Sequence, residues 1–347
     1  MEVLVAIAVL AVLLGIIAAV TQATSLAVRQ ASGKLNTYGA ARAAFNTLNE
    51  KLSEATLNTY LDYYDGENPA QLRTAANMGT FTPVVYGRVS NLEFVVKQNS
   101  NPAVGFNTAG AGGTGYGQEV YFQCPDAYST QSFYQSTQGL LNAVGYYVQY
   151  GSNSSFRPSL ITASKWRYRL MQAIEPTEQL QVYANGSANL DTPAAWTANI
   201  ANTGAGNAPA ADALPLADNV IALVVWPRLP TAQDATGIQL APNYIYDSQF
   251  KVMTGTPPNQ IQPLWADQLP PIVQVTMVVI DEASAIRIDT KSATPPAVIE
   301  SALQGKFANV TEYSSDLASL ENSLAANHIK FEALNTAVVL RESKWSQ

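Results

Sequence analysis

Cysteine and histidine are almost missing from this chain of 347 residues. The one cysteine, Cys124, excludes an internal disulfide, but an oxidising compartment permits disulfides without requiring them, so export is not excluded. Cys124 ends a strand-like run and is expected to be a small buried apolar residue rather than a reactive thiol. The one histidine, His328, has no recognisable spacing of metal ligands around it, so we expect no histidine-based metal site.

Charged residues are also scarce, because they make up 13% of the chain and leave a net charge of -7. The 19 Lys and Arg residues are scattered along the sequence, so no basic field is available to hold a polyanion. We therefore expect no nucleic acid among the partners. Hydrophobic residues make up 47%, and Gly, Pro, Asn, Thr and Ser fill much of the remainder, which is typical of extracytoplasmic β-rich proteins.

Motifs for catalysis or cofactor binding are few. The segment from Gly110 to Gly115 has dinucleotide-binding spacing, but a strand rather than a helix is expected after it, so we interpret it as a Gly-rich loop. No Gly-x-Ser-x-Gly elbow is present, and we expect no enzyme activity. Asp62, Asp65 and Glu67 cluster beside a glycine without forming a regular calcium loop, so turn acids are favoured and calcium is kept as the alternative; no other cofactor is expected.

One long hydrophobic run stands out at the N-terminus. From Val3 to Val20 the chain has no charged or polar side chain, and as a helix this run would be about 27 Å long, close to the thickness of a bilayer core. Nothing basic precedes it, which disfavours a cleaved signal peptide. Glu2 adjoins the run and would cost several kcal/mol if left unpaired in lipid, so it either has a partner or lies among the headgroups as a helix N-terminal acid.

The helical pattern continues beyond this run. Apolar residues recur at spacings of three and four, which predicts one continuous helix with an amphipathic second part. We expect a transmembrane anchor at 1–25, its amphipathic continuation at 26–59 and a β-rich body at 60–347. The residues expected to pack the helix on the body are Leu35, Tyr38, Phe45, Leu48 and Leu52.

The segment Glu-Val-Leu-Val-Ala-Ile-Ala-Val-Leu-Ala, which begins at Glu2, resembles the N-terminus of type IV prepilins and type II secretion pseudopilins. In that family a Gly/Phe-type cleavage site and three further residues precede the acid, whereas Met1 directly precedes it here. The resemblance implies that Glu2 neutralises the α-amino group of a neighbouring subunit. It also implies a prepilin peptidase as a partner where a full leader lies upstream.

A second resemblance covers nearly the whole chain. Five stretches resemble the Verru_Chthon cassette protein C family, pilin-like proteins encoded in multi-gene cassettes in Verrucomicrobia. These stretches are Ala55 to Tyr60, Leu92 to Gln98, Arg167 to Met171, Leu216 to Pro230 and Leu340 to Trp345. More loosely, the plan resembles the J-type minor pseudopilin, a long helix packed on a β-rich domain. Both resemblances imply assembly and export rather than chemistry.

The body is predicted to consist mainly of strands, with one short helix at 314–326. Candidate strands lie at 84–96, 119–123, 143–150, 179–183, 219–226, 272–281 and 337–341. Three long stretches between them, 99–117, 184–215 and 227–263, are rich in Gly, Asn, Ala, Thr and Pro and are predicted to be loops.

Together these features predict an α+β protein, in which a long N-terminal helix, a membrane span plus an amphipathic half, packs on a β-rich pilin-like domain with long loops. The predicted function is that of a minor subunit of a type IV filament or type II secretion-type pseudopilus. We expect a single pass through the inner membrane, a periplasmic or extracellular body, and other pilin-like subunits as partners through the helix. The alternative is an extracytoplasmic binding module or enzyme on a plain signal anchor. A basic leader upstream of Met1 would favour the first interpretation.

Overall fold

The computed structural model describes residues 2–67, 70–98, 118–134, 137–154, 156–185, 196–197, 213–249, 255 and 261–345. In the N-terminal helix, the described side chains are those at positions 10, 13–22, 24 and 36 onward.

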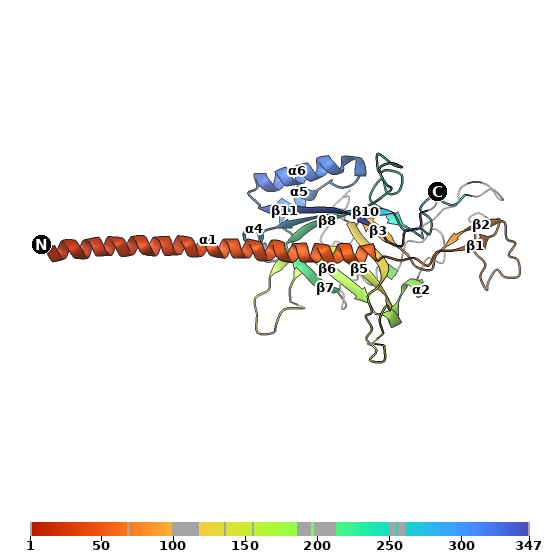
Figure 1. The fold of residues 1–347 in the computed structure, drawn as a ribbon, viewed down its shortest axis with the longest axis horizontal. Helices are drawn as coiled ribbons and strands as arrows, with labels where there is room; N and C mark the ends of the chain where they lie inside the picture. Colours follow the sequence, from red (N-terminus) through yellow and green to blue (C-terminus); the bar gives the residue numbers. More distant parts are fainter. Residues whose placement is uncertain are drawn as a thin grey trace.

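The helix α1 (Glu2–Ser53) is the longest element of the chain. Its N-terminal half extends away from the body, and its C-terminal half lies along it (Figure 1). The helix ends where the backbone turns into the body, and Thr56 N–H donates to the carbonyl of Gln123 at 2.9 Å. The predicted helix runs to residue 59, so this contact with the body ends the helix earlier than the sequence pattern suggests.

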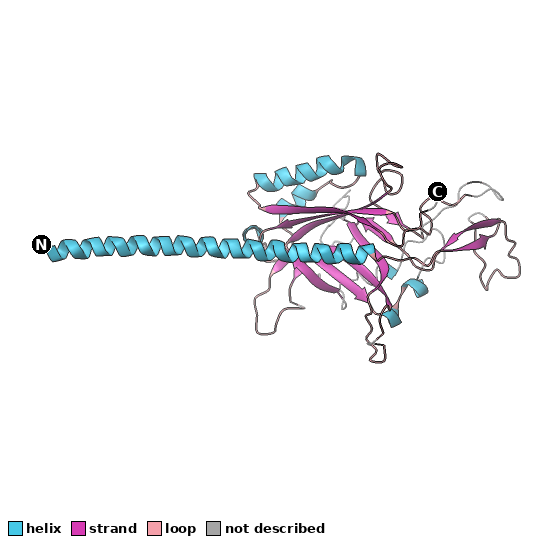
Figure 2. Cartoon of the chain, in the orientation of Figure 1, coloured by secondary structure: helices cyan, strands magenta, loops and turns pink. Residues whose placement is uncertain are grey.

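The body contains two main antiparallel sheets (Figure 2). The larger has six strands in the order β7-β6-β5-β4-β3-β9, and the smaller has three in the order β11-β10-β8. The strands of the larger sheet are β3 (Val95–Gln98), β4 (Gln118–Pro125), β5 (Leu141–Ser152), β6 (Trp166–Glu175), β7 (Ala213–Asp218) and β9 (Tyr246–Asp247). Those of the smaller sheet are β8 (Val220–Arg228), β10 (Ile272–Ile280) and β11 (Phe331–Val339).

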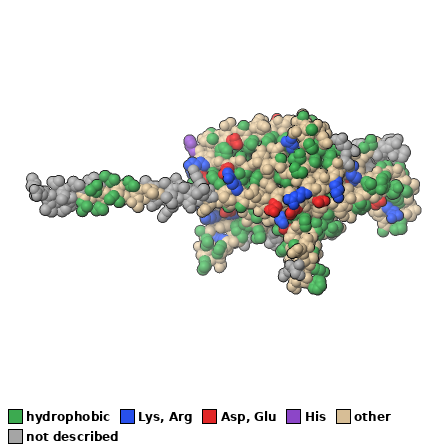
Figure 3. All heavy atoms as spheres, in the orientation of Figure 1, with side chains coloured by type: hydrophobic (Ala, Val, Ile, Leu, Met, Phe, Trp, Pro, Cys, Tyr) green, Lys and Arg blue, Asp and Glu red, His purple; other side chains and the backbone are tan. Residues whose placement is uncertain are grey.

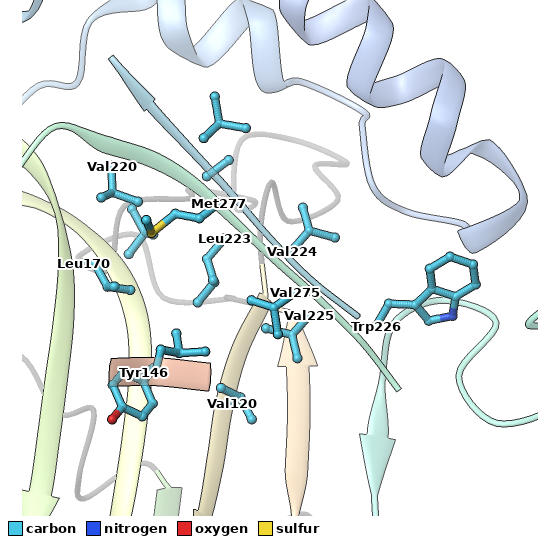
Figure 4. Close-up of a cluster of buried hydrophobic side chains, with 14 of the residues drawn as sticks. Val120, Tyr146, Leu170, Val220, Leu223, Val224, Val225, Trp226, Val275 and Met277 are labelled. Carbon is cyan, nitrogen blue, oxygen red and sulfur yellow. The ribbon is translucent and has the colours of Figure 1, made fainter. Parts of the chain in front are cut away.

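The two sheets pack face to face, and the main hydrophobic core lies between them (Figure 4). Side chains alternate along each strand, so Val120 and Tyr146 of the larger sheet meet Leu223 and Val275 of the smaller one. All four side chains are fully buried. Strands β8 and β10 carry near-continuous apolar runs because both of their faces are covered.

Short helices cover the side of the smaller sheet that faces away from the larger one. The helix α4 (Glu282–Ile288) follows β10, and α5 (Ala297–Leu303) and α6 (Tyr313–Ala326) lie over the sheet (Figure 1). The 3-10 turn η2 (Val310–Glu312) directly precedes α6. Tyr313 fixes α6 in place, because its hydroxyl lies 2.6 Å from the hydroxyl of Thr276 on β10.

A smaller cluster of buried side chains lies on the outer face of the larger sheet. It includes Tyr121, Tyr147 and Trp196, with Val182 from the short helix α2 (Val182–Asn185). The 3-10 turn η1 (Thr177–Gln179) connects β6 to α2. A separate two-stranded sheet, formed by β1 (Tyr60–Tyr64) and β2 (Val85–Val89), lies at the end of the molecule far from the N-terminus (Figure 1).

The predicted fold class is wrong in its membrane span. Among the residues whose side chains are described, no helix is long and apolar enough to cross a membrane. This finding contradicts the predicted anchor and the predicted single pass through the inner membrane with a periplasmic or extracellular body, and nothing in the described structure supports the pilus and secretion-system terms used for the chain.

The helix predicted at 314–326 is confirmed by α6, but the other short helices of the body are not predicted. Besides α1, the described chain has four short α-helices, the longest being α6, where the sequence analysis predicts one. The body itself is mostly β-sheet. The strand predicted at 179–183 is absent, because η1 and α2 occupy that segment and turn Val182 into the outer cluster. The strands predicted at 119–123, 143–150, 219–226 and 272–281 are confirmed by β4, β5, β8 and β10.

Candidate functional site

The projecting half of α1 is the most unusual surface of the molecule. Its large described side chains are aliphatic, and each is between 50% and 60% exposed. These residues, which we call the aliphatic ridge, are Leu10, Leu13, Leu14, Ile16, Ile17 and Val20. Figure 3 shows hydrophobic side chains on this part of the helix, clear of the body. A soluble monomer seldom exposes such an apolar patch, so this surface is the candidate functional site.

The ridge occupies one side of the helix. With about 100° between successive residues, its members lie within an arc of about 160°. The opposite side carries Gly15, Ala18 and Ala19, all exposed, and we call it the small-residue face. A side chain at Gly15 would meet nothing within 4 Å. The same helix therefore presents a surface of large side chains and a flat surface that a second helix can approach closely.

The C-terminal half of α1 belongs to the core. Ala41, Phe45, Leu48 and Leu52 are buried, and the helix contacts both β7 and β11. The helix thus closes the side of the sandwich between the edges of the two sheets (Figure 2). Tyr38 is partly buried, and burial together with the charges of Asp281 and Glu332 raises its pKa to about 12.

Ion pairs join α1 to the body at three levels. The guanidinium of Arg42 lies 2.6 Å from Glu332 Oε1 on β11. In the last turn of the helix, the ammonium of Lys51 contacts the carboxylate of Asp126, which directly follows β4. Near the helix end, Arg341 lies 3.8 Å from Glu54. Packing and these ion pairs fix the C-terminal half of α1 on the body.

The remaining predicted site residues fall into two groups. The side chains of Glu2, Val3 and Leu35 lie outside the described residues, although their backbone is helical. Val20, the expected end of the anchor, belongs to the exposed aliphatic ridge.

The calcium candidates do not converge on one point. Asp65 is buried, and its Oδ1 accepts hydrogen bonds from the backbone N–H groups of Glu67 and Gln71 at 3.2 and 2.8 Å. Asp62 accepts from the N–H of Tyr63 at 2.7 Å. Within the described part of the chain, no three His, Cys, Asp or Glu side chains form a group that could hold a metal ion. The structure therefore uses Asp65 to close a turn.

A pocket beside β3 and β9 has no counterpart in the sequence analysis. Lys97 of β3 and Asp247 of β9 both line it, and the fully buried Glu93 lies close to Asp247. The sequence feature that could have indicated this pocket is the placement of two charged residues, Glu93 and Lys97, in a run that otherwise has the apolar pattern of a buried strand. Asp247 lies in a stretch that the sequence predicts to be a loop, so its pairing with β3 could not be read from the chain.

Comparison of the chain with protein-family models, with curated proteins and with solved structures gives no match. The resemblances to pilin-like families therefore stay predictions.

Proposed function

We propose that this protein is a structural subunit that assembles with further copies of itself, and with related subunits, through the projecting half of α1. The observation that carries the proposal is the aliphatic ridge, together with the small-residue face on the opposite side of the same helix. The proposal retains the filament-subunit role expected from the sequence and includes no membrane stage. It involves no chemical reaction.

The partner that best fits the aliphatic ridge is a second copy of the same chain. The large side chains of one helix fit the flat surface around Gly15 and Ala18 of another, since small residues let two helix backbones approach closely. Such a contact joins two different surfaces, so every added copy still offers one free ridge and one free small-residue face. Heterologous contacts of this kind repeat and generate rings or open filaments.

The expected energies favour assembly with several neighbours over a simple pair. Complete burial of a Leu or Ile side chain contributes about 1.5–3 kcal/mol, so covering side chains that are already half covered contributes roughly 1 kcal/mol each. The ridge would thus supply roughly 6 kcal/mol, whereas association costs about 4–15 kcal/mol. Contact with one neighbour would then barely offset the free-energy cost of association. Contacts on both sides of the helix make the assembled state stable.

The sequence gives Glu2 a part in the same proposal. At the tip of α1, its carboxylate would compensate a positive charge on a neighbouring helix and so set the relative position of the two subunits. Replacing Glu2 with Gln should leave the fold unchanged and weaken assembly.

The test is the size distribution of the full-length protein between about 1 and 100 µM, measured by sedimentation velocity and by negative-stain microscopy. The parent protein should form concentration-dependent assemblies. The double variant Leu13→Gln/Ile17→Gln on the ridge, and the variant Ala18→Leu on the small-residue face, should each shift it toward monomer. Met78→Gln removes an equally exposed apolar side chain from the body and serves as the control.

Two results would overturn the proposal. The first is a parent protein that stays monomeric over the whole range. The second is assembly that responds to Met78→Gln as strongly as to the ridge variants, which would indicate unspecific association.

A further inference from the structure

A pocket of about 410 Å³ lies at the edge of the larger sheet, where β9 pairs with β3. Its walls are mostly apolar and include Leu240, Ile245 and Trp265. Volume and lining match the usual site for a small organic molecule, which combines an apolar enclosure with a few placed polar groups. The pocket lies on the body, so it is separate from the helix surface of the proposed function.

A pair of carboxyl groups forms one polar side of this pocket. Asp247 lies on the wall, and Glu93 is fully buried behind it. The indole N–H of Trp196 donates to Glu93 Oε2 at 2.6 Å, which fixes the position of the Glu93 side chain. Burial, the charge of Asp247 and a hydrogen bond with Asp247 raise the pKa of Glu93 to about 9. At neutral pH Glu93 therefore keeps its proton, and Asp247 is the member of the pair that lines the pocket.

The nearby cation is already engaged. Lys97 lies two residues beyond Val95 on the same face of β3, and its ammonium is 2.7 Å from Thr197 Oγ1 and 3.7 Å from Glu119 Oε1. It also lies 5.0 Å from the centre of the Tyr121 ring. The Tyr121 hydroxyl donates to Glu119 Oε2 at 2.6 Å and holds that carboxyl toward Lys97. Lys97 is thus compensated by its own surroundings.

Burial of the Glu93 carboxyl group lowers the stability of the fold, so a purely structural role does not explain it well. An apolar residue at position 93 would pack without desolvating a carboxyl group, and buried polar groups add stability only when they are fully paired. Titratable groups that are strongly shifted and that border a pocket are typical of binding sites.

We propose that the pocket binds a small organic cation, a primary amine on an apolar body, with the ammonium group at Asp247 and the apolar part against Leu240, Ile245 and Trp265. An ammonium group next to a carboxylate in a largely apolar enclosure forms a charge-assisted hydrogen bond, which is stronger than a bond between neutral groups. Glu93 acts as a positioning residue that orients Asp247 from behind.

The test compares three probes that share one apolar body and differ in charge: 2-phenylethylamine, 2-phenylethanol and 3-phenylpropionate. Binding to the full-length protein is measured by isothermal titration calorimetry. The amine should bind at least about tenfold more tightly than the alcohol, a factor that corresponds to about 1.4 kcal/mol, and the carboxylate should not bind. Adsorption to the aliphatic ridge would not distinguish the three probes, because their apolar parts match.

Two variants place the site. Asp247→Asn should weaken amine binding at least about tenfold, while Glu321→Gln on α6, outside the pocket lining, should leave it unchanged. Ile245→Lys adds a cation to the wall at an exposed position that tolerates substitution, and it should abolish amine binding and permit binding of 3-phenylpropionate.

Equal binding of all three probes, or full amine binding by both Asp247→Asn and Ile245→Lys, would overturn the proposal. Neither result would bear on assembly through α1. Likewise, a protein that fails to assemble can still bind the amine, so the two proposals fail separately.

Discussion

The indole ring of Trp226 lies directly against the backbone of Gly237. Trp226 Nε1–H donates to the Gly237 carbonyl at 3.3 Å, and a Cβ atom at position 237 would lie 2.2 Å from Trp226 Cζ2. The loop that presents Gly237 is closed by Asp234, whose carboxylate accepts hydrogen bonds from the backbone N–H groups of residues 236, 237 and 239. Arg228 lies over the other part of the same indole, 5.0 Å from the ring centre.

Gly237→Ala should therefore destabilise the protein strongly. The backbone at Gly237 has φ +72°, which is unfavourable for alanine, and the added methyl group would displace a core tryptophan. We expect a loss of about 2–4 kcal/mol in the free energy of unfolding, measured by urea denaturation.

Gly139→Ala is the matched control for this substitution. Gly139 has φ +76° but open space around it, so it shares the backbone conformation without the overlap. Its loss should be about 1 kcal/mol. Equal losses for both variants would show that the contact with Trp226 has no energetic weight.

Strands with a simple apolar pattern could be predicted from the sequence, whereas strands with buried charge could not. The strands β8 and β10 are mostly apolar and lie where the pattern places them. Strand β6 was missed because Arg167 and Arg169 interrupt its apolar pattern. Both are buried, since Arg167 lies 2.8 Å from Asp289 and Arg169 lies 2.7 Å from Asp218. These partners come from distant parts of the chain.

Other errors have local causes. The strand predicted at 84–96 is two strands in different sheets, because Asn58 Oδ1 accepts hydrogen bonds from the N–H groups of Asn91 and Leu92 and stabilises a turn between them. Strand β7 contains Pro215, which argues against a central strand, but β7 is an edge strand whose register shifts between Leu170 and Met171 of its partner. Proline is tolerated at such a position.

The two candidate sites, the α1 surface and the pocket at β3 and β9, also differ in how far the sequence predicts them. The helix surface is local in sequence, so its apolar residues could be named from spacing alone. The pocket depends on the pairing of Val95 with Asp247, which is a long-range contact that the residue pattern does not specify.

The attachment of α1 to the body gives a second prediction. Leu48 is fully buried between α1 and the sheets, so Leu48→Ala should lower the free energy of unfolding by about 2–5 kcal/mol through lost burial and a cavity. Asn46→Ala, on the exposed side of the same helical turn, should change it by less than about 0.5 kcal/mol. Circular dichroism during denaturation is the measurement. A small effect at Leu48 would mean that the helix docks on the body only loosely.

Cys124 gives a third prediction, which concerns reactivity. The side chain is fully buried, and burial, followed by the charge of Asp126, raises the pKa of its thiol to about 12. Because the thiolate is the reactive form, the folded protein should not react with Ellman's reagent at pH 8, and it should release one equivalent of the chromophore after unfolding in guanidinium chloride. Rapid reaction of the folded protein would show that the core opens around β4.

The fourth prediction concerns pH and the carboxyl pair at the pocket. The pKa of Glu93 is raised from 4.5 in the unfolded chain to about 9 in the folded protein, by burial first and then by Asp247. Between these two values the folded protein binds a proton at Glu93 that the unfolded chain has released. The contribution of Glu93 to stability is thus fully present below pH 4.5 and is lost as the pH rises toward 9.

Glu93→Gln removes this titration and keeps a side chain of the same shape that still accepts from Trp196 and donates to Asp247. The stability of the parent minus that of the variant should fall as the pH rises from 5 to 9, by up to about 1.4 kcal/mol per pH unit. Urea denaturation at pH 5, 7 and 9 measures this difference, and the subtraction cancels the titration of groups that both proteins share. Asn46→Ala, on the exposed side of α1, provides a control that neither adds nor removes a titrating group, so its difference should stay constant over the same range. If the parent and Glu93→Gln curves run parallel from pH 5 to 9, Glu93 takes up no proton on folding and is ionised in the folded protein.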